Sequence, residues 1–155
     1  RVRVIATLNL VDARNLFYVG DALARRFLVV RFEYPKGDED LDVMLRDPEV
    51  AKGLRDDEVR ELREFVRRLR GSIRAEAERR ESETGIKGWL RYFNVSPASL
   101  REALLLYASA KREGEGWDRQ KFVAALRSAL GTINEEAVSL FDYVVGDVLK
   151  GGGRQ

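Results

Sequence analysis

The hydrophobic and polar positions of the chain change their period after residue 35, and this change divides the sequence into two unlike parts. The first 35 residues contain two apolar runs rich in β-branched residues, VRVIATL before Asn9 and FLVVRFEY before Pro35. Such runs are typical of strands that are buried on both faces of a parallel sheet. Between them, Asp21 would cap a short helix with the sequence ALARR. The pattern predicts strand, loop, short helix and strand, as at the end of an α/β unit.

Residues 36–150 show instead the three- and four-residue spacing of amphipathic helices. We expect the polar segment 36–40 to be a hinge, followed by a short helix around 41–45. Asp47-Pro48 predicts the start of another helix, which Gly53 would end. A long helix is predicted to open at Asp56 and to bury a stripe consisting of Val59, Leu62, Val66, Leu69 and Ile73.

The long helix carries many arginines and glutamates outside that stripe. We expect these side chains to be solvated and paired across one helical turn. The alternative is a basic ridge that contacts a phosphate backbone or a partner. Residues 76–84 are charged and contain few apolar side chains, so a frayed helix end or a loop is expected there.

Three further helices are predicted by their capping residues. Ser96-Pro97 would start the first, which ends at Gly114 or Gly116. Asp118 would cap the second, and Gly131 would end it. A capping box at Thr132-x-x-Glu135 would start the third. Their inward stripes are predicted to be Leu100, Ala103, Leu104, Tyr107 and Ala108; Phe122, Val123, Leu126 and Leu130; and Val138, Phe141, Val144, Val145 and Val148.

The remaining segments complete the predicted organisation. Trp89, Leu90, Tyr92 and Phe93 are expected to dock on the helical core, with an exposed binding patch as the alternative. Residues 151–155 read as a flexible tail. The predicted fold is therefore an α/β remnant over residues 1–35 and an all-α helical domain over residues 36–150, mostly α overall.

Composition limits the chemistry that is available to the chain. The 155 residues include 28 Lys and Arg and 26 Asp and Glu, a net charge of +2 that by itself argues for no nucleic-acid partner. There is no cysteine and no histidine, which excludes disulfides, thiol chemistry, the usual zinc sites and histidine bases. The high charge resembles that of thermophile surfaces. Neither a signal peptide nor an 18-residue apolar run is found, so we expect a cytoplasmic protein without a membrane partner.

Candidate site residues cluster in the first part of the chain. Ligands of parallel α/β sheets bind at the carboxyl ends of strands, and Asn9 stands at the end of the first predicted strand, followed by Asp12. The amide of Asn9 can orient a water or a phosphate but cannot act as a base. Arg25 and Arg26, at the end of the short helix, could face phosphate oxygens, or they could be ordinary surface charges.

These residues carry a resemblance to a known family. The motifs TLN-x-x-D over 7–12 and D-x-L-x-R-R-F over 21–27, with a strand that stops at Pro35, resemble the second half of an AAA+ ATPase core of the McrB/MoxR-like, dynein-related branch. The resemblance implies that Asn9 is sensor 1, which positions the attacking water. It also implies that Arg25 and Arg26 supply an arginine finger to the nucleotide of a neighbouring subunit.

The helical part would then be the lid of the ATPase. Members of this branch often begin a lid helix with Ser-Pro-Arg, whose arginine, sensor 2, touches the nucleotide. Here the corresponding arginine is Arg101, displaced by three residues or about one turn, and an exposed pair with Glu102 is the alternative. Asp12 and Arg101 are accordingly the candidate nucleotide-binding residues.

Two motifs of the family are missing from the sequence. It contains neither a G-x-x-x-x-G-K-[ST] phosphate loop nor an apolar strand that ends in Asp-Glu. We therefore expect the C-terminal part of a longer ATPase that uses ATP or GTP with magnesium, forms a homo-oligomeric ring and acts on a protein or nucleic-acid substrate. This part alone is expected to bind no cofactor. The alternatives are a non-catalytic helical interaction module and a nucleic-acid-binding helical domain.

Overall fold

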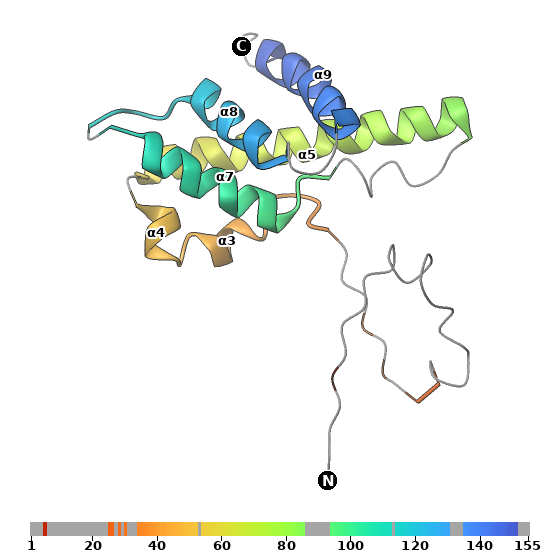
Figure 1. The fold of residues 1–155 in the computed structure, drawn as a ribbon, viewed down its shortest axis with the longest axis horizontal. Coiled ribbons are helices and arrows are strands. Elements are labelled where there is room, and N and C mark those ends of the chain that lie inside the picture. The colour runs from red at the N-terminus through yellow and green to blue at the C-terminus, as the bar shows by residue number, and fades with distance from the viewer. Residues whose placement is uncertain are drawn as a thin grey trace. The chain divides into compact units, whose positions relative to one another are not determined.

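The computed structural model divides the chain into two units, residues 1–33 and residues 34–155. It describes residues 5, 25–26, 28, 30, 34–52, 54–85, 94–112, 114–130 and 135–151. All regular structure in these ranges is helical, in agreement with the expected mostly-α fold. The helices are α3 (Leu41–Met44), α4 (Pro48–Ala51), α5 (Asp56–Thr84), α7 (Pro97–Ala110), α8 (Arg119–Leu130) and α9 (Glu135–Gly151) (Figure 1). The two predicted strands lie almost wholly outside the described residues.

Three predicted helix starts are confirmed by their capping hydrogen bonds. Asp47 Oδ1 accepts from the backbone N–H of Glu49 at 3.0 Å, and Ser96 Oγ accepts from that of Ser99 at 3.1 Å. Asp118 Oδ1 accepts from two backbone amides of the first turn of α8, at 2.9 and 3.0 Å. Each oxygen satisfies donors that have no partner within the helix, which is why these residues begin α4, α7 and α8.

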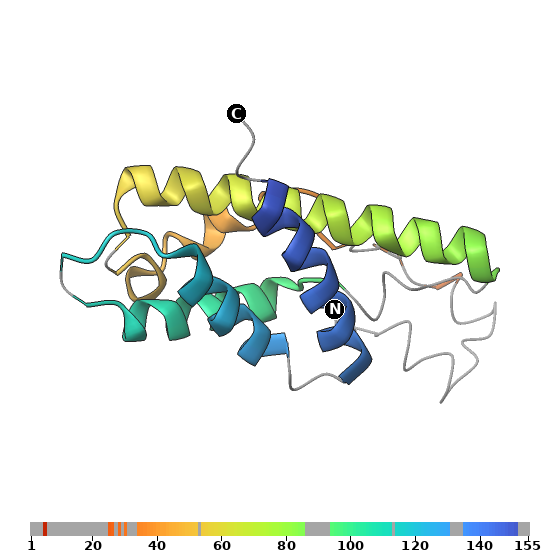
Figure 2. The ribbon, with the colours of Figure 1, turned by 90° about the horizontal axis from the view of Figure 1, so that it is seen from above.

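Helix α5 is the longest element of the helical unit, at 29 residues or about 43 Å. Helix α9 packs against it, α8 packs against α7 and α9, and α4 packs against α7 (Figure 2). The core between these helices consists mainly of aliphatic side chains. Its fully buried members include Leu41, Val50, Leu62, Val66, Leu69, Leu100, Leu104, Phe122 and Leu126.

The aromatic side chains of the core meet where α5, α7 and α8 come together. Phe122 packs edge-on against both Phe65 and Tyr107, with ring centroids 5.9 Å apart in each pair. Trp117 lies against Tyr107 and Phe122 at 5.1 and 5.2 Å. Such contacts add to the burial of apolar area that holds the helices together. Phe65 and Trp117 were not part of the predicted inward stripes.

Several sequence predictions need correction. Residues 76–84 are not a loop or a frayed end, because α5 continues to Thr84 and ends at Gly85, whose φ of 69° suits glycine. Helix α7 ends at Ala110, four residues before Gly114. Leu140 is buried, whereas Val138 is only half-buried.

Other predictions fall outside the described residues or concern the membrane. The aromatic segment 86–93, the stops at Gly53 and Gly131, the start of the capping box at 132–134 and the tail at 152–155 are not among the residues that the structure describes. Within the described ranges, no helix has both the length and the apolar character that a membrane span requires.

Candidate functional site

The residues predicted for catalysis lie in the first unit. Asn9 and Asp12 are outside the described residues. Arg25 and Arg26 are described, and both are exposed side chains within a turn. Their guanidinium groups are therefore open to solvent, and their relation to Asn9 lies outside the described residues.

Arg101, the candidate sensor 2, lies on α7 and pairs with a residue of the same unit. Its Nη2 donates to Oδ2 of Asp47 at 2.7 Å, across the contact between α7 and α4. The hydrogen bond from Arg101, together with that from the Glu49 amide, lowers the pKa of Asp47 below its ordinary value. Both side chains are partly exposed, so this ion pair contributes little to stability.

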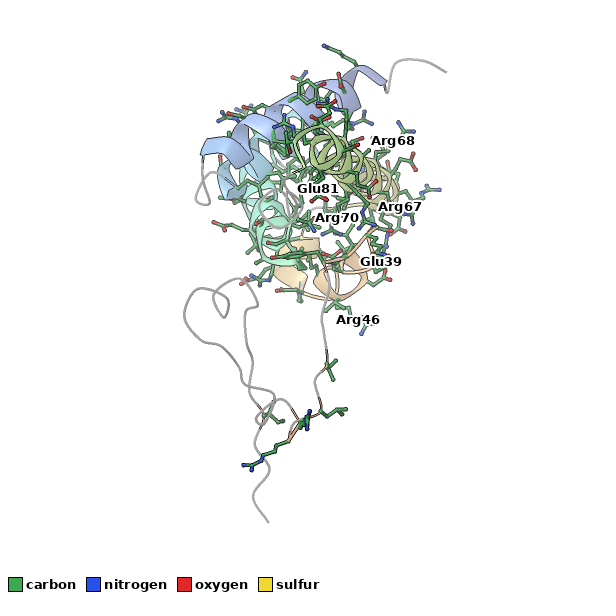
Figure 3. All side chains as sticks on the ribbon, turned by 90° about the vertical axis from the view of Figure 1, so that its right-hand side faces the viewer. Glu39, Arg46, Arg67, Arg68, Arg70 and Glu81 are labelled. Atoms are coloured by element: carbon green, nitrogen blue, oxygen red, sulfur yellow. The ribbon has the colours of Figure 1, made fainter. Side chains whose placement is uncertain are left out.

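The most extensive polar cluster of the described residues joins α5 to the segment before α3 and to the first turn of α3. We call it the arginine clamp and define it as Arg63, Arg67 and Arg70 with Asp38, Asp40 and Asp42. Figure 3 labels Arg67 and Arg70 on α5 together with Glu39 of the opposing segment. All three arginines bind carboxylates that stand 21 to 30 residues earlier in the chain.

Arg70 forms the buried centre of the clamp. Its Nη1 and Nη2 donate to the two carboxylate oxygens of Asp40, at 2.6 and 2.8 Å. The same two nitrogens donate to the backbone carbonyls of Gly37, at 2.6 Å, and Val95, at 3.1 Å. The Arg70 side chain is only 2% exposed, so its charge depends on these four acceptors in place of water.

Asp38 forms the second centre. Arg67 donates to both of its oxygens, at 2.6 and 3.3 Å, and Arg63 donates to Oδ2 at 2.9 Å while also reaching Asp42. Burial by itself would raise the pKa of Asp38, but the hydrogen bonds from Arg67 and Arg63 outweigh it and lower that pKa. Asp38 is therefore held as a carboxylate at neutral pH.

The clamp corrects two expectations from the sequence. Residues 37–40 were predicted to belong to a polar hinge, yet they are fixed to α5 by hydrogen bonds and ion pairs. Arg70 and Glu58 were expected on the solvated side of α5, and both are buried. Spacing along one helix could not reveal this, because the partners of these charges lie on other segments.

Glu58 forms a second buried ion pair, in the first turn of α5. Its Oε2 accepts from Nζ of Lys111 at 2.6 Å and from the backbone N–H of Arg55 at 2.9 Å, which closes the first turn of α5. Burial would raise the pKa of Glu58, and these hydrogen bonds lower it overall. Since Lys111 directly follows α7, the pair ties the end of that helix to the start of α5.

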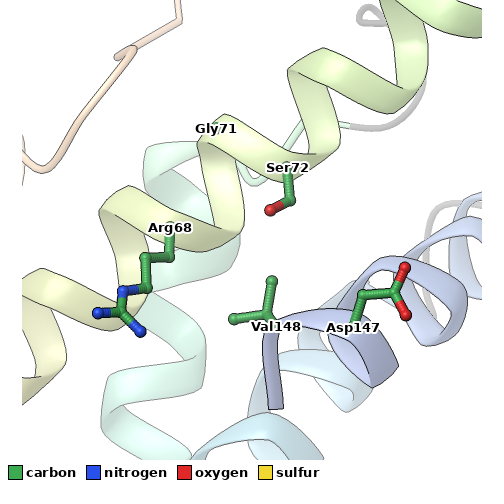
Figure 4. A pocket seen from close by; sticks show the side chains of 5 residues that line it. All are labelled: Arg68, Gly71, Ser72, Asp147 and Val148. Carbon is green, nitrogen blue, oxygen red and sulfur yellow. The ribbon is translucent and has the colours of Figure 1, made fainter. Parts of the chain in front are cut away.

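A groove of about 420 Å³ lies between α5 and α9. Arg68, Gly71 and Ser72 line it from α5, and Asp147 and Val148 line it from α9 (Figure 4). Arg68 is paired with Glu64 one turn earlier. The groove thus presents one hydroxyl, one carboxylate and an engaged guanidinium, and no set of converging groups that would define a reaction.

Comparison of the chain with protein-family models, with curated proteins and with solved structures finds no match. The functional interpretation therefore depends on the residues of the chain itself.

Proposed function

We propose that the chain is the C-terminal part of an AAA+ ATPase that couples nucleoside triphosphate hydrolysis to the remodelling or translocation of a macromolecule. The observation that carries the proposal is the order of two features along the chain. The motifs TLN-x-x-D and D-x-L-x-R-R-F stand in residues 7–27, and a helical unit of at least six helices begins directly after them. An α/β core followed by a helical lid is the order that the resemblance implies.

The proposed roles follow from the chemistry of phosphoryl transfer. That reaction is catalysed by positioning the nucleophile and by stabilising charge on the transferred group. Asn9 would orient the attacking water with its amide, and Arg25 or Arg26 would bring positive charge to a nucleotide on a neighbouring subunit. The exposure of both arginines is compatible with a role at such a subunit interface.

Arg101 fits the proposal only with a change of partner. As a sensor for the nucleotide it would exchange the carboxylate of Asp47 for a phosphate oxygen. Because both side chains are partly exposed, the pair is weak enough for such an exchange. Nucleotide and magnesium would bind to the intact protein, which would supply the phosphate loop and the acidic strand that this sequence lacks.

The arginines of α5 give less support to nucleic-acid binding. Arg63, Arg67 and Arg70 are engaged with Asp38, Asp40 and Asp42, while Arg68 and Arg79 pair with glutamates of α5 itself. Phosphate contacts would require each of them to give up a carboxylate. A basic ridge that is neutralised from within the chain attracts a polyanion less strongly.

The test begins with the reading frame that encodes this chain. A phosphate loop and an apolar strand ending in Asp-Glu should occur roughly 80 to 150 residues upstream, as the size of an α/β domain requires. The intact protein should then hydrolyse ATP or GTP, and Asn9→Ala should abolish turnover while nucleotide binding is kept. The 155-residue chain alone should release no phosphate. Sustained release from the pure chain, lost on Asn9→Ala, would overturn the expectation that this part alone is inactive. A reading frame without the two upstream motifs would overturn the proposal itself.

A further inference from the structure

We infer that residues 37–40 move as part of the helical unit, so that any bending of the chain ahead of this unit ends within the joint Tyr34, Pro35 and Lys36. The arginine clamp is the observation that carries this inference. It does not depend on the proposed ATPase function, because it concerns only how the chain enters the helical unit.

The clamp immobilises the entry segment from several directions. Arg70 binds the carbonyl of Gly37 and both oxygens of Asp40, so one buried guanidinium holds both ends of this four-residue segment. Between those ends, Asp38 is held by Arg63 and Arg67. A planar guanidinium that donates two parallel hydrogen bonds fixes the orientation of its partner as well as its distance.

The three residues before the clamp lack such contacts. Tyr34 and Lys36 are exposed, and no hydrogen bond or ion pair joins Tyr34, Pro35 or Lys36 to another described residue. The pyrrolidine ring fixes φ of Pro35 and restricts the backbone of Tyr34 before it. These three residues are therefore not held by the clamp, and Pro35 limits their backbone dihedral angles.

A short joint next to an anchored segment has a mechanical consequence. A rotation of the backbone at residue 34 is transmitted to α5, because the clamp begins at residue 37, directly after the joint. The helical unit would follow a movement of the joint as one body, with the clamp as its point of attachment.

Backbone dynamics measured by ¹⁵N relaxation test the inference on the 155-residue chain. The heteronuclear NOE of the amides of residues 38–40 should equal that of residues 62–73 in α5. The values for Tyr34 and Lys36 should be clearly lower. Equal mobility across residues 34–40, whether all high or all low, would overturn the inference.

Substitutions in the clamp test whether its ion pairs hold the entry segment rigid, independently of the stability of the helical unit. Arg63→Gln combined with Arg67→Gln removes the two partly exposed partners of Asp38 and leaves the Arg70–Asp40 pair in place. The NOE of residues 38 and 39 should fall toward that of Lys36, while Asp40, still held by Arg70, and the helices α5, α7 and α8 keep their values. Arg68→Gln, on the same helix but paired only with Glu64 among these residues, is the matched control and should change nothing. Unchanged rigidity of residues 38 and 39 in the double variant would contradict the role of Arg63 and Arg67 in the clamp.

Discussion

Arg70 and Asp40 form a two-pronged ion pair inside the helical unit, with nitrogen–oxygen distances of 2.6 and 2.8 Å. The Arg70 side chain is 2% exposed and that of Asp40 is 12% exposed. Two charges so far from water are stable only together, because either one alone would be buried without compensation. The pair therefore makes the fold sensitive to the loss of a single side chain.

Arg70→Met should lower the free energy of unfolding by about 3–5 kcal/mol, the range found when one partner of a buried ion pair is removed. Urea denaturation at pH 7 measures the change. Arg68→Met, which removes a half-exposed partner of Glu64, should lose no more than about 1 kcal/mol. Adding Asp40→Leu to Arg70→Met should recover part of the loss. Equal losses for Arg70→Met and Arg68→Met would contradict this assignment.

Stability should fall as the pH drops from about 5 toward 2. The hydrogen bond from Arg79 is the largest influence on Glu76, burial opposes it, and the hydrogen bond from Arg80 adds to it, so that the pKa falls from 4.5 to about 2. A carboxyl whose pKa is lower in the folded state stabilises the fold above its unfolded-state pKa. That stabilisation is lost as the pH falls through the folded-state pKa.

The contribution of Glu76 is at most about 3–4 kcal/mol, from about 1.4 kcal/mol per pKa unit. Glu76→Gln should flatten this part of the pH profile in urea denaturation series. Glu83→Gln is the control, since Glu83 is exposed and pairs only with Arg79 among the described residues. Parallel profiles for the wild type and Glu76→Gln would show that the carboxyl is not linked to folding.

The isolated chain should self-associate through its first unit. Ile5 and Leu28 are each 93% exposed and Val30 is 62% exposed, although the sequence predicts strands at these positions. Exposed apolar side chains and strand edges favour pairing with another copy. Light scattering over a wide concentration range should show dimers or larger species. Leu28→Glu with Val30→Glu should shift the chain toward the monomer.

Val43→Glu is the matched control for self-association. Val43 is also exposed, at 69%, but it lies on α3 in the helical unit. Its replacement should leave the association unchanged. A clean monomer for the wild-type chain at all concentrations, or an equal effect of the control, would contradict the prediction.

In the proposed intact ATPase, Arg25 and Arg26 should act in trans. Alanine at either position should reduce turnover on the order of a thousandfold or more and change nucleotide affinity far less, because a finger stabilises charge in the transition state. Mixing this variant with protein mutated at its phosphate-loop lysine should restore part of the activity. Inactive mixtures of variants that still assemble and bind nucleotide would rule out the trans role.

The local features of the helical unit were predictable from the sequence, and its long-range polar contacts were not. Asp47, Ser96 and Asp118 cap helices where predicted, because a cap depends only on residues within one turn. Helix α7 ended earlier than glycine spacing suggested. Lys111 leaves the helix with ψ of 131° and reaches Glu58, a residue 53 positions away.

The arginine clamp was not predicted either, because its ion pairs join residues that are far apart in the sequence. In a helical pattern, arginines beside an apolar stripe indicate a solvated face, and that interpretation holds for Arg68 but is wrong for Arg70. The difference depends on Asp40, which stands 30 residues earlier. The run of acidic residues at 38–42 was the one available signal. The predictions of a catalytic Asn9 and a nucleotide-binding Asp12 fall outside the described residues and stay predictions.

The contacts of Arg70 also bear on the order in which the chain folds. Its guanidinium binds the carbonyls of Gly37 and Val95, so it joins the segments that precede α3 and α7. Each contact can form only after its own segment has reached α5, so we expect both to form late on the folding pathway. Replacing Arg70 should then accelerate unfolding much more than it slows refolding, the behaviour of a residue with a low φ-value. This ion pair would govern how long the native state persists.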